Sequence, residues 1–187
     1  MPDSRADDAR IACPLFQAEY GGEVPTSALQ LRIARISYEK FKELNFAWHS
    51  RLPHTTNCFE GICFGAEYNN LYYGVAWWSK PIARALADRE MYELRRMALS
   101  SDRPKNTASR FLAVMVKLLK QQKPEVKCFI SYQDTDVHSG TIYKAAGWTI
   151  GNIGERIEES AKYNNWKTRE NRMNQSIAPK IRWEKYL

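Results

Sequence analysis

A polar, basic turn at residues 100–106 carries the first of two groups of side chains that could do chemistry. It precedes a helical pattern that begins at Thr107, and Asn106 stands where it could cap that helix. Free amides at a helix N-terminus, together with nearby cations, bind phosphates or a pyrophosphate without a glycine-rich loop. The candidate anion ligands are Arg103, Lys105, Asn106, Thr107, Ser109 and Arg110. Taken alone, the turn favours the simpler interpretation of a capped helix with solvated basic side chains.

The second group of reactive side chains is spread over several elements. Ser131 lies near the end of an apolar run, Asp134 lies in the polar loop that follows, and Tyr143 lies in a short helical pattern. His49 begins an earlier polar loop. A carboxylate or an imidazole near an amine can take its proton as a new bond forms, so Asp134 and His49 are candidate bases. The simpler interpretations are an Asx turn for Asp134 and an exposed loop position for His49.

A metal site is a further option for three of these residues. His49, Asp134 and Tyr143 together offer the nitrogen and oxygen ligands that transition metals bind. Their sequence spacing does not test this option, because they lie on separate elements. The four cysteines include no CxxC pair, so a structural zinc site is not expected.

The elements that must position these residues alternate between strands and helices. In chain order, the predicted elements are a strand at 29–36, a helix that follows Ser37 and runs toward Trp48, a β-hairpin with strands at 59–68 and 71–78, a strand at 91–99, a helix at 107–122, a strand at 126–132, a short helix that stops at Gly147, and a strand at 180–187. This order predicts an α/β (α+β) domain with a mostly antiparallel twisted sheet and helices on both faces. Residues 1–26 are predicted to form an irregular arm, and residues 27–187 a single domain.

Alternation within two strands predicts which side chains share a face. In the strand at 91–99, Leu94 and Arg96 should lie on one face, with Glu93 and Arg95 on the other. Trp77 and its neighbour should point to opposite faces, so at most one of the two can line a site.

Composition indicates a soluble protein with an anionic partner. The net charge is +7 and the pI is near 9.2, which favours nucleic acid or phosphate-bearing ligands. A merely basic soluble protein would show the same charge. No apolar run approaches the roughly 20 residues of a membrane span, so we expect no membrane association and a cytoplasmic location.

Residues 142–148 resemble the ending of GNAT acyl-CoA N-acyltransferases, in which a tyrosine protonates the departing CoA thiolate. Here that tyrosine is Tyr143, which three residues separate from Gly147 and the tryptophan after it. A wider set of segments resembles the phage Mom family, a GNAT-like group of DNA-modifying proteins. These segments are residues 81–84, 93–96, 104–111, 131–134 and 138–145. The resemblance covers residues 41–151 and therefore most of the chain.

The resemblance implies a specific reaction on DNA. Mom proteins convert adenine in phage DNA to N6-carbamoylmethyladenine, which blocks host restriction enzymes. For this chain the resemblance implies acetyl-CoA or a related acyl-CoA as donor, and iron has been linked to family members. It assigns catalytic roles to His49, Ser131, Asp134 and Tyr143. Ser50 follows His49 where the family typically has a tyrosine, and the glycines of the standard CoA loop are missing.

Double-stranded DNA is the partner that the resemblance implies, within the cytoplasm of the host cell. An adenine turned out of the duplex would need an aromatic pocket, and its phosphates would need cations. The candidate pocket residues are Trp48, Trp77, Trp78 and Tyr132. The candidate phosphate contacts are Arg51, Lys80, Arg84, Lys162, Lys167, Arg169 and Arg172.

Two other functions remain open from the sequence. One is a conventional GNAT acetyltransferase that uses acetyl-CoA on a small-molecule or protein amine. The other is a non-catalytic DNA-binding or partner-binding protein that kept the fold. The oligomeric state is also open, with a homodimer as one option.

Overall fold

The computed structural model describes residues 22–55, 60–87, 90–154 and 178–187. The arm predicted at 1–26 lies mostly outside these residues. The first described element is a short 3-10 helix, η2 (Ala28–Gln30), which Ser27 caps. Leu29 N–H donates to the Ser27 hydroxyl, and Ser27 N–H donates to the Gln30 side chain, so two free donors are satisfied at once.

The described strands form one seven-stranded sheet in the order β1-β2-β3-β4-β5-β7-β6. The strands are β1 (Arg32–Ile36), β2 (Ile62–Tyr68), β3 (Leu71–Ser79), β4 (Met91–Leu99), β5 (Cys128–Asp134), β6 (Thr149–Ile153) and β7 (Lys180–Tyr186). Only β4 and β5 pair in parallel; every other neighbouring pair is antiparallel. The predicted mostly antiparallel sheet is confirmed. Strand β6 was not predicted.

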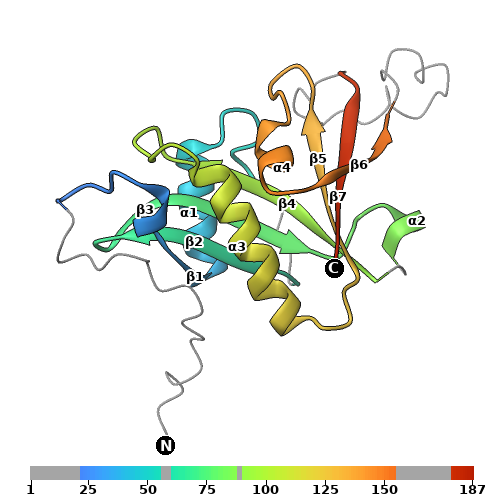
Figure 1. Ribbon diagram of the computed structural model, residues 1–187, viewed down its shortest axis with the longest axis horizontal. Coiled ribbons are helices and arrows are strands. Elements are labelled where there is room, and N and C mark those ends of the chain that lie inside the picture. Colours follow the sequence, from blue (N-terminus) through green and yellow to red (C-terminus); the bar gives the residue numbers. More distant parts are fainter. Residues whose placement is uncertain (1–21, 56–59, 88–89, 155–177) are drawn as a thin grey trace, which may run out of the picture.

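Helices cover both faces of the sheet, as predicted. Helix α3 (Thr107–Gln122) crosses one face, and α4 (Thr141–Ala145) lies beside it (Figure 1). Helix α1 (Tyr38–Trp48) covers the other face, and the short α2 (Arg84–Ala87) packs there through Leu86. Below, these are called the α4 face and the α1 face.

The cores on the two faces follow from the side chains that each helix presents. Along α3, Phe111, Leu112, Met115 and Leu119 are fully buried against the sheet. Their spacing of three or four residues produces one apolar stripe. On the α1 face, Phe41 of the first helix packs among the side chains of β2, β3 and β4.

Strand β4 contains a bulge at Arg95. Trp77 of β3 faces Arg96, whereas Trp78 faces Leu94, so Arg95 is an extra residue in the ladder. A bulge resets the alternation of side chains. Arg95 lies over the Trp77 ring at 5.7 Å, so Arg95 and Arg96 both reach the α1 face. The predicted placement of Leu94 and Arg96 on one face is therefore wrong.

Strands β4 and β5 diverge beyond the bulge. Their pairing runs from Met91 and Cys128 to Leu94 and Ser131, and each strand then continues without the other. Figure 1 shows β5 and β7 turning away from the first strands of the sheet, with α4 next to the divergence. We call this region the strand opening. The residues that frame it on β5 are Ser131, Tyr132, Gln133 and Asp134.

The described helices give no indication of a membrane span. Among the helices that the structure describes, none is both long enough and apolar enough to cross a bilayer.

Candidate active site

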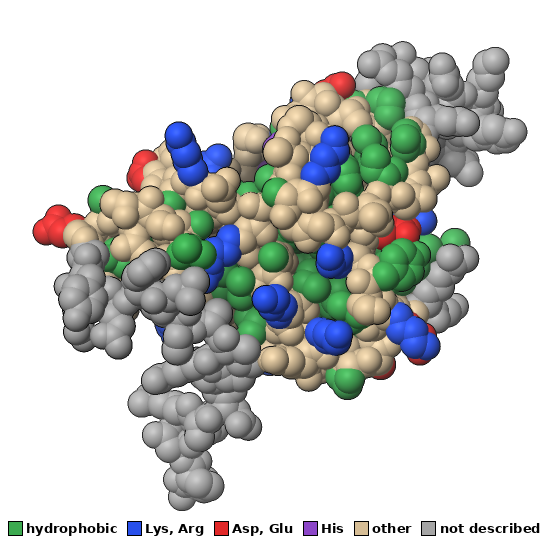
Figure 2. Space-filling model, viewed as in Figure 1, with side chains coloured by type: hydrophobic (Ala, Val, Ile, Leu, Met, Phe, Trp, Pro, Cys, Tyr) green, Lys and Arg blue, Asp and Glu red, His purple; other side chains and the backbone are tan. Residues whose placement is uncertain are grey.

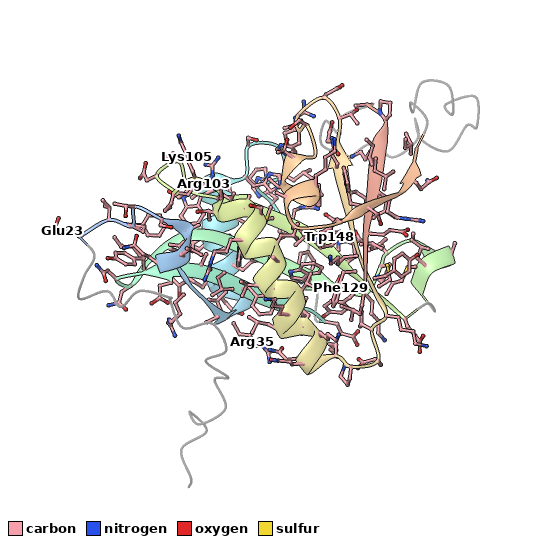
Figure 3. The ribbon with its side chains drawn as sticks, in the orientation of Figure 1. Glu23, Arg35, Arg103, Lys105, Phe129 and Trp148 are labelled. Atoms are coloured by element: carbon pink, nitrogen blue, oxygen red, sulfur yellow. The ribbon has the colours of Figure 1, made fainter. Side chains whose placement is uncertain are left out.

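A cavity of about 450 Å³ lies between the N-terminal end of α3 and the side of α4. Of the six predicted anion ligands, the structure brings five to its wall: Arg103, Lys105, Asn106, Thr107 and Ser109. Figure 3 shows Arg103 and Lys105 on the loop that leads into α3, at the end of the helix that faces α4. The wall therefore combines two cationic side chains with a helix N-terminus, which suits a phosphate or pyrophosphate.

The backbone before α3 keeps the first amides of the helix free of a side-chain cap. Asn106 occupies the N-cap position with φ 64°, in the left-handed region, and its side chain makes no capping hydrogen bond. The prediction that Asn106 caps the helix through its side chain is wrong. The turn is held instead by Thr107, whose hydroxyl donates to the Pro104 carbonyl at 2.8 Å. Arg103 donates to the Ser100 carbonyl at 2.8 Å, which fixes its guanidinium beside the cavity.

Arg110 does not belong to the cavity, although it was predicted as an anion ligand. Its guanidinium donates to the carbonyl of Leu31 at 3.2 Å and ties α3 to the start of β1. Burial lowers the pKa of Arg110 below its ordinary value, in keeping with a structural position. Arg110 directly follows Ser109 of the cavity wall, and the rotation of the helix from one residue to the next carries its side chain to another side.

Ser131 and Tyr143 form a buried hydroxyl pair at the strand opening. The two oxygens lie 2.9 Å apart, and either residue can be the donor. Ser131 faces α4, which carries Tyr143, and both residues are almost fully buried. Burial raises the pKa of Tyr143 above its ordinary value, while the hydrogen bond to Ser131 acts in the opposite direction. Tyr143 therefore keeps its proton at neutral pH, and when Ser131 donates, that proton is free for another acceptor.

Two aromatic rings and one amide hold the Tyr143 ring in place. Trp183 of β7 stacks on it with centroids 5.3 Å apart and planes 12° apart, and Trp148 meets it edge-on at 5.8 Å. Trp183 donates through its indole N–H to Gln133 at 2.7 Å. Gly140 lies against this group, because a Cβ there would come within 2.5 Å of the Gln133 side-chain oxygen. This packing fixes one ring orientation.

Asp134 lies on the opposite face of β5 and uses both of its carboxylate oxygens. Oδ1 accepts from the backbone N–H of Asp136 at 3.1 Å, which makes the Asx turn that the sequence left as an alternative. Oδ2 accepts from Arg51 at 3.2 Å. The structure thus shows a structural role for Asp134 in addition to its predicted catalytic role, which stays a prediction.

His49 caps the C-terminal end of α1 and points one ring nitrogen into its own loop. Nδ1 accepts from the backbone N–H groups of Leu52 and Arg51 at 3.2 and 3.4 Å. Burial, then the charges of Arg96 and His138, lower the pKa of His49 from 6.5 to about 4. The imidazole is therefore neutral at pH 7, and an accepting Nδ1 places its proton on Nε2. In this state Nε2 of His49 can donate a hydrogen bond, whereas the sequence predicted that His49 acts as a base.

The predicted metal trio is divided between the two faces of the sheet. Tyr143 lies on the α4 face with Ser131, whereas Asp134 lies on the α1 face with Arg51. Within the described ranges, no three His, Cys, Asp or Glu side chains come close enough to hold a metal ion. The donor set therefore does not fit a bound iron.

The candidate DNA contacts have different outcomes. Trp77 and Trp78 point to opposite faces, as predicted, but both are buried. Tyr132 is 40% exposed beside the strand opening. Lys80 is exposed. The positions outside the described residues or side chains are Arg84, Lys162, Lys167, Arg169 and Arg172.

Sequence reasoning missed several residues of the site. Thr141, Ile142 and Ala145 of α4 complete the cavity wall, and Gln133 and Trp183 position Tyr143. The pairing of Arg51 with Asp134 was also missed. An apolar-polar alternation at residues 180–187 could have pointed to Trp183, but its contact with Tyr143 depends on β7 lying beside β5.

Comparison with solved structures shows a GNAT acetyltransferase fold. An acetyltransferase from Bacillus subtilis in complex with CoA is 15% identical, with a TM-score of 0.58, and the match covers 84% of this chain and 99% of that chain. IAA acetyltransferase from Bacillus cereus is 16% identical, with a TM-score of 0.60 and the same coverage. The ribosomal-protein-S18-alanine N-acetyltransferase from Escherichia coli is 10% identical, with a TM-score of 0.57, covering 82% and 92%. At these identities the likeness establishes the fold alone.

Comparison with protein families is more specific. No curated protein matches the sequence. The model of the Mom protein family matches residues 30–185, which include the cavity, the hydroxyl pair and both strands of the opening. The chain belongs to the Mom protein family.

Proposed function

We propose that this protein converts adenine in DNA to N6-carbamoylmethyladenine with an acyl-CoA-type donor, and so protects the DNA from restriction enzymes. The observation that carries the proposal is the buried Ser131–Tyr143 pair, which lies at the strand opening of a GNAT fold next to a cationic cavity. Family membership supports the DNA substrate. Acyl transfer is the general chemistry that the fold supports.

The residues of the α3 cavity fit the diphosphate of a CoA molecule. Arg103 and Lys105 would supply positive charge, and the uncapped first turn of α3 would supply backbone donors. Together they replace the glycine-rich loop that the sequence lacks. Arg110 takes no part, because it is bound to Leu31.

An acyl-CoA, when bound, would supply an activated carbonyl carbon and a thiolate leaving group, so that the thioester C–S bond breaks as the amine nitrogen bonds to the carbonyl carbon and an N6-acyl adenine forms. The carbamoylmethyl group has a methylene carbon on N6, so this transfer is one step toward it and not the whole conversion. Tyr143 holds a proton at a buried hydroxyl and donates it to the departing sulfur. Ser131 orients that hydroxyl from 2.9 Å away. Trp183 keeps the ring in one orientation, so little reorganisation is needed during the reaction.

The α1 face would receive the adenine. Its exocyclic amine is a weak nucleophile because the lone pair is delocalised into the ring, so removal of its proton assists bond formation. Asp134 is the group that takes this proton, once Arg51 leaves its Oδ2 for a DNA phosphate. Arg51 can make that exchange because its side chain is 45% exposed. His49 donates through Nε2, which suits a ring nitrogen of the base.

Iron enters none of these steps. The nitrogen and oxygen side chains that could bind it lie on opposite faces of β5 among the described residues. The acyl-transfer step therefore rests on the hydroxyl pair and on Asp134.

The direct test is the nucleoside content of DNA from bacteria that express the protein. Nuclease digestion followed by mass spectrometry should reveal a carbamoylmethylated deoxyadenosine that cells with an empty vector lack. Restriction enzymes that cut at adenine-containing sites should digest the same DNA poorly. Unmodified deoxyadenosine in cells that contain soluble, folded protein would overturn the proposal.

A conventional acetyltransferase is the second candidate, because the fold is shared with such enzymes. This reading predicts that purified protein releases CoA from acetyl-CoA in the presence of free or protein amines. It also predicts that DNA neither accepts the group nor inhibits the reaction. Release of CoA only when DNA is present would exclude this candidate.

A further inference from the structure

Tyr132 is an exposed aromatic residue in the middle of the sheet. The side chains of β5 alternate, so Ser131 and Gln133 face α4, whereas Tyr132 and Asp134 face the other side. Tyr132 is 40% exposed, although its strand neighbours Ser131 and Gln133 are buried. An aromatic ring that stays in contact with water forgoes the stabilising free energy that its burial would contribute. Its exposure therefore needs an explanation.

The position of Tyr132 is tied to the strand opening. The parallel pairing of β4 and β5 ends at Ser131, so Tyr132 is the first β5 residue beyond it. On β4 the first residues beyond the pairing are Arg95 and Arg96, and the bulge turns both to the same face as Tyr132. The ring thus lies where the α1 face meets the reaction centre.

Polar groups hold the Tyr132 hydroxyl and leave the ring accessible. Arg182, its direct partner on β7, hydrogen-bonds it, and Glu93 lies close enough to affect it. Burial, and then Glu93, raise the pKa of Tyr132, so the phenol is neutral at physiological pH. Asp134 and Arg51 lie next along the same face.

The other candidate aromatics are less exposed than Tyr132. Trp77 is buried beneath Arg95, Trp78 is buried on the α4 face, and Trp48 packs against the core under α1. On the opposite side of the molecule, Lys and Arg side chains are dispersed singly over the α3 surface (Figure 2). On the α1 side of the opening, Arg182 hydrogen-bonds the hydroxyl of the exposed Tyr132 ring, and Arg51 pairs with Asp134 two residues further along β5.

We infer that Tyr132 is the stacking platform for an unpaired adenine, with the guanidinium groups around it contacting the phosphates of the same strand. This inference rests on the proposed function, whose base-binding step it locates. A flat ring with a fixed hydroxyl presents one face to a base, and base–aromatic stacking tolerates any strand sequence around it. Asp134, two residues further along β5, then lies beside the exocyclic amine of the stacked base.

The test measures binding of single-stranded oligonucleotides to the full-length protein by fluorescence anisotropy. One oligonucleotide carries a single adenine flanked by abasic sites, and its pair carries an abasic site at the adenine position as well. We expect Tyr132→Ala to weaken binding of the adenine strand about tenfold and to leave the abasic strand unchanged. Tyr132→Phe, which keeps the ring, should bind both strands as the wild type does.

Tyr186→Ala is the matched control. Tyr186 is a tyrosine of the neighbouring strand β7, is 62% exposed, and lies at the end of the sheet where β4 and β5 are still paired. Its loss should not change the ratio of the two affinities. Unchanged binding by the abasic strand also shows that each variant is folded.

Three results would overturn the inference. They are no preference of the wild-type protein for the adenine strand, an unchanged ratio in Tyr132→Ala, and an equal loss in Tyr132→Phe. If DNA becomes modified in cells but the ratio is unchanged in Tyr132→Ala, the inference fails and the proposed function stands. If the ratio falls as expected but nucleosides stay unmodified, the proposed function fails and the platform stands.

Discussion

The two faces of β5 use polar side chains in opposite ways. On the α4 face, Ser131, Gln133 and Tyr143 are neutral, buried, and held by each other and by Trp183. On the α1 face, Asp134 and Arg51 are charged, partly exposed, and paired across elements distant in the sequence. Neutral groups can be buried once their hydrogen bonds are satisfied, whereas charges need water or a partner. The first face is built to keep one geometry, and the second to exchange partners.

This contrast separates positioning from recognition. A buried hydroxyl pair with stacked aromatic walls keeps its geometry before substrate arrives, as catalysis by proton transfer requires. A half-exposed ion pair contributes little to stability, so either partner can move to a ligand at low cost. Substitutions in the hydroxyl pair should therefore change turnover, whereas substitution of the exposed Arg51 on the α1 face should change DNA binding.

Tyr143→Phe is the sharpest test of the α4 face. The variant removes the proton donor but keeps the ring that stacks on Trp183. We expect modification of DNA to fall by about 10²- to 10⁴-fold, the usual contribution of a general acid or base. Stopped reactions analysed by nucleoside mass spectrometry would measure it. A fall in DNA affinity of similar size, with unchanged turnover, would contradict the assignment of proton transfer to the α4 face and of DNA binding to the α1 face.

Substitution of Arg103 and Lys105 by Ala tests the cavity on the α4 side. The loss of two cations should raise the KM for the acyl-CoA donor about tenfold, because charge-assisted hydrogen bonds are worth more than neutral ones. DNA binding should be unaffected. Arg110→Ala is the matched control from the same helix, and it should lower thermal stability while leaving KM unchanged. A rise in KM in Arg110→Ala alone would contradict the assignment of the CoA diphosphate to the cavity.

Asp134→Asn tests the α1 face with little change in shape. The amide oxygen can still accept from Asp136 N–H, so the turn persists, but the charge that pairs with Arg51 is lost. We expect the thermal stability to fall by less than about 1 kcal/mol, because the ion pair is half exposed. Because the amide cannot take the proton of the adenine amine, modification of DNA should fall, while binding of the acyl-CoA donor should stay unchanged. Wild-type activity in this variant would mean that Asp134 has only a structural role, in the turn with Asp136.

His49 provides the smallest effect, and it appears in the pH dependence of stability. The folded pKa of about 4 lies below the ordinary 6.5, so between these values the unfolded chain binds more protons. The free energy of unfolding should hold above pH 6.5 and decrease as pH falls toward 4. His49→Asn keeps an acceptor for the two amides and should flatten this dependence. The free energy of unfolding can be measured by urea denaturation of both proteins across this pH range. If it depended on pH in the same way in both, the neutral, partly buried imidazole would be contradicted.

The sequence predicted most elements because their signals are local. Asn69 and Asn70 adopt positive φ at the hairpin, and Gly147 adopts φ +72° at the end of α4. Strand β6 escaped prediction because all five of its residues are exposed, which leaves no apolar alternation. The bulge at Arg95 also leaves no trace in the sequence, because two adjacent arginines fit ordinary alternation as well as an inserted residue.

The site was less predictable than the fold because it depends on contacts between distant segments. Five of six anion ligands line one cavity, since they belong to a single turn and the helix after it. The pairing of Arg51 with Asp134 joins a loop to the end of β5, and only the completed sheet brings the two together. Such a contact has no periodicity that could have revealed it.

The place of β7 in the sheet has a consequence for how the molecule is made. Strand β7 follows β6 in the sequence but inserts between β5 and β6, and it carries the ring that stacks on Tyr143. A nascent chain on the ribosome therefore lacks the ring that orders Tyr143 until residues 180–186 have been synthesised and released from the exit tunnel. Chains interrupted before that point should therefore lack the Tyr143–Trp183 stack.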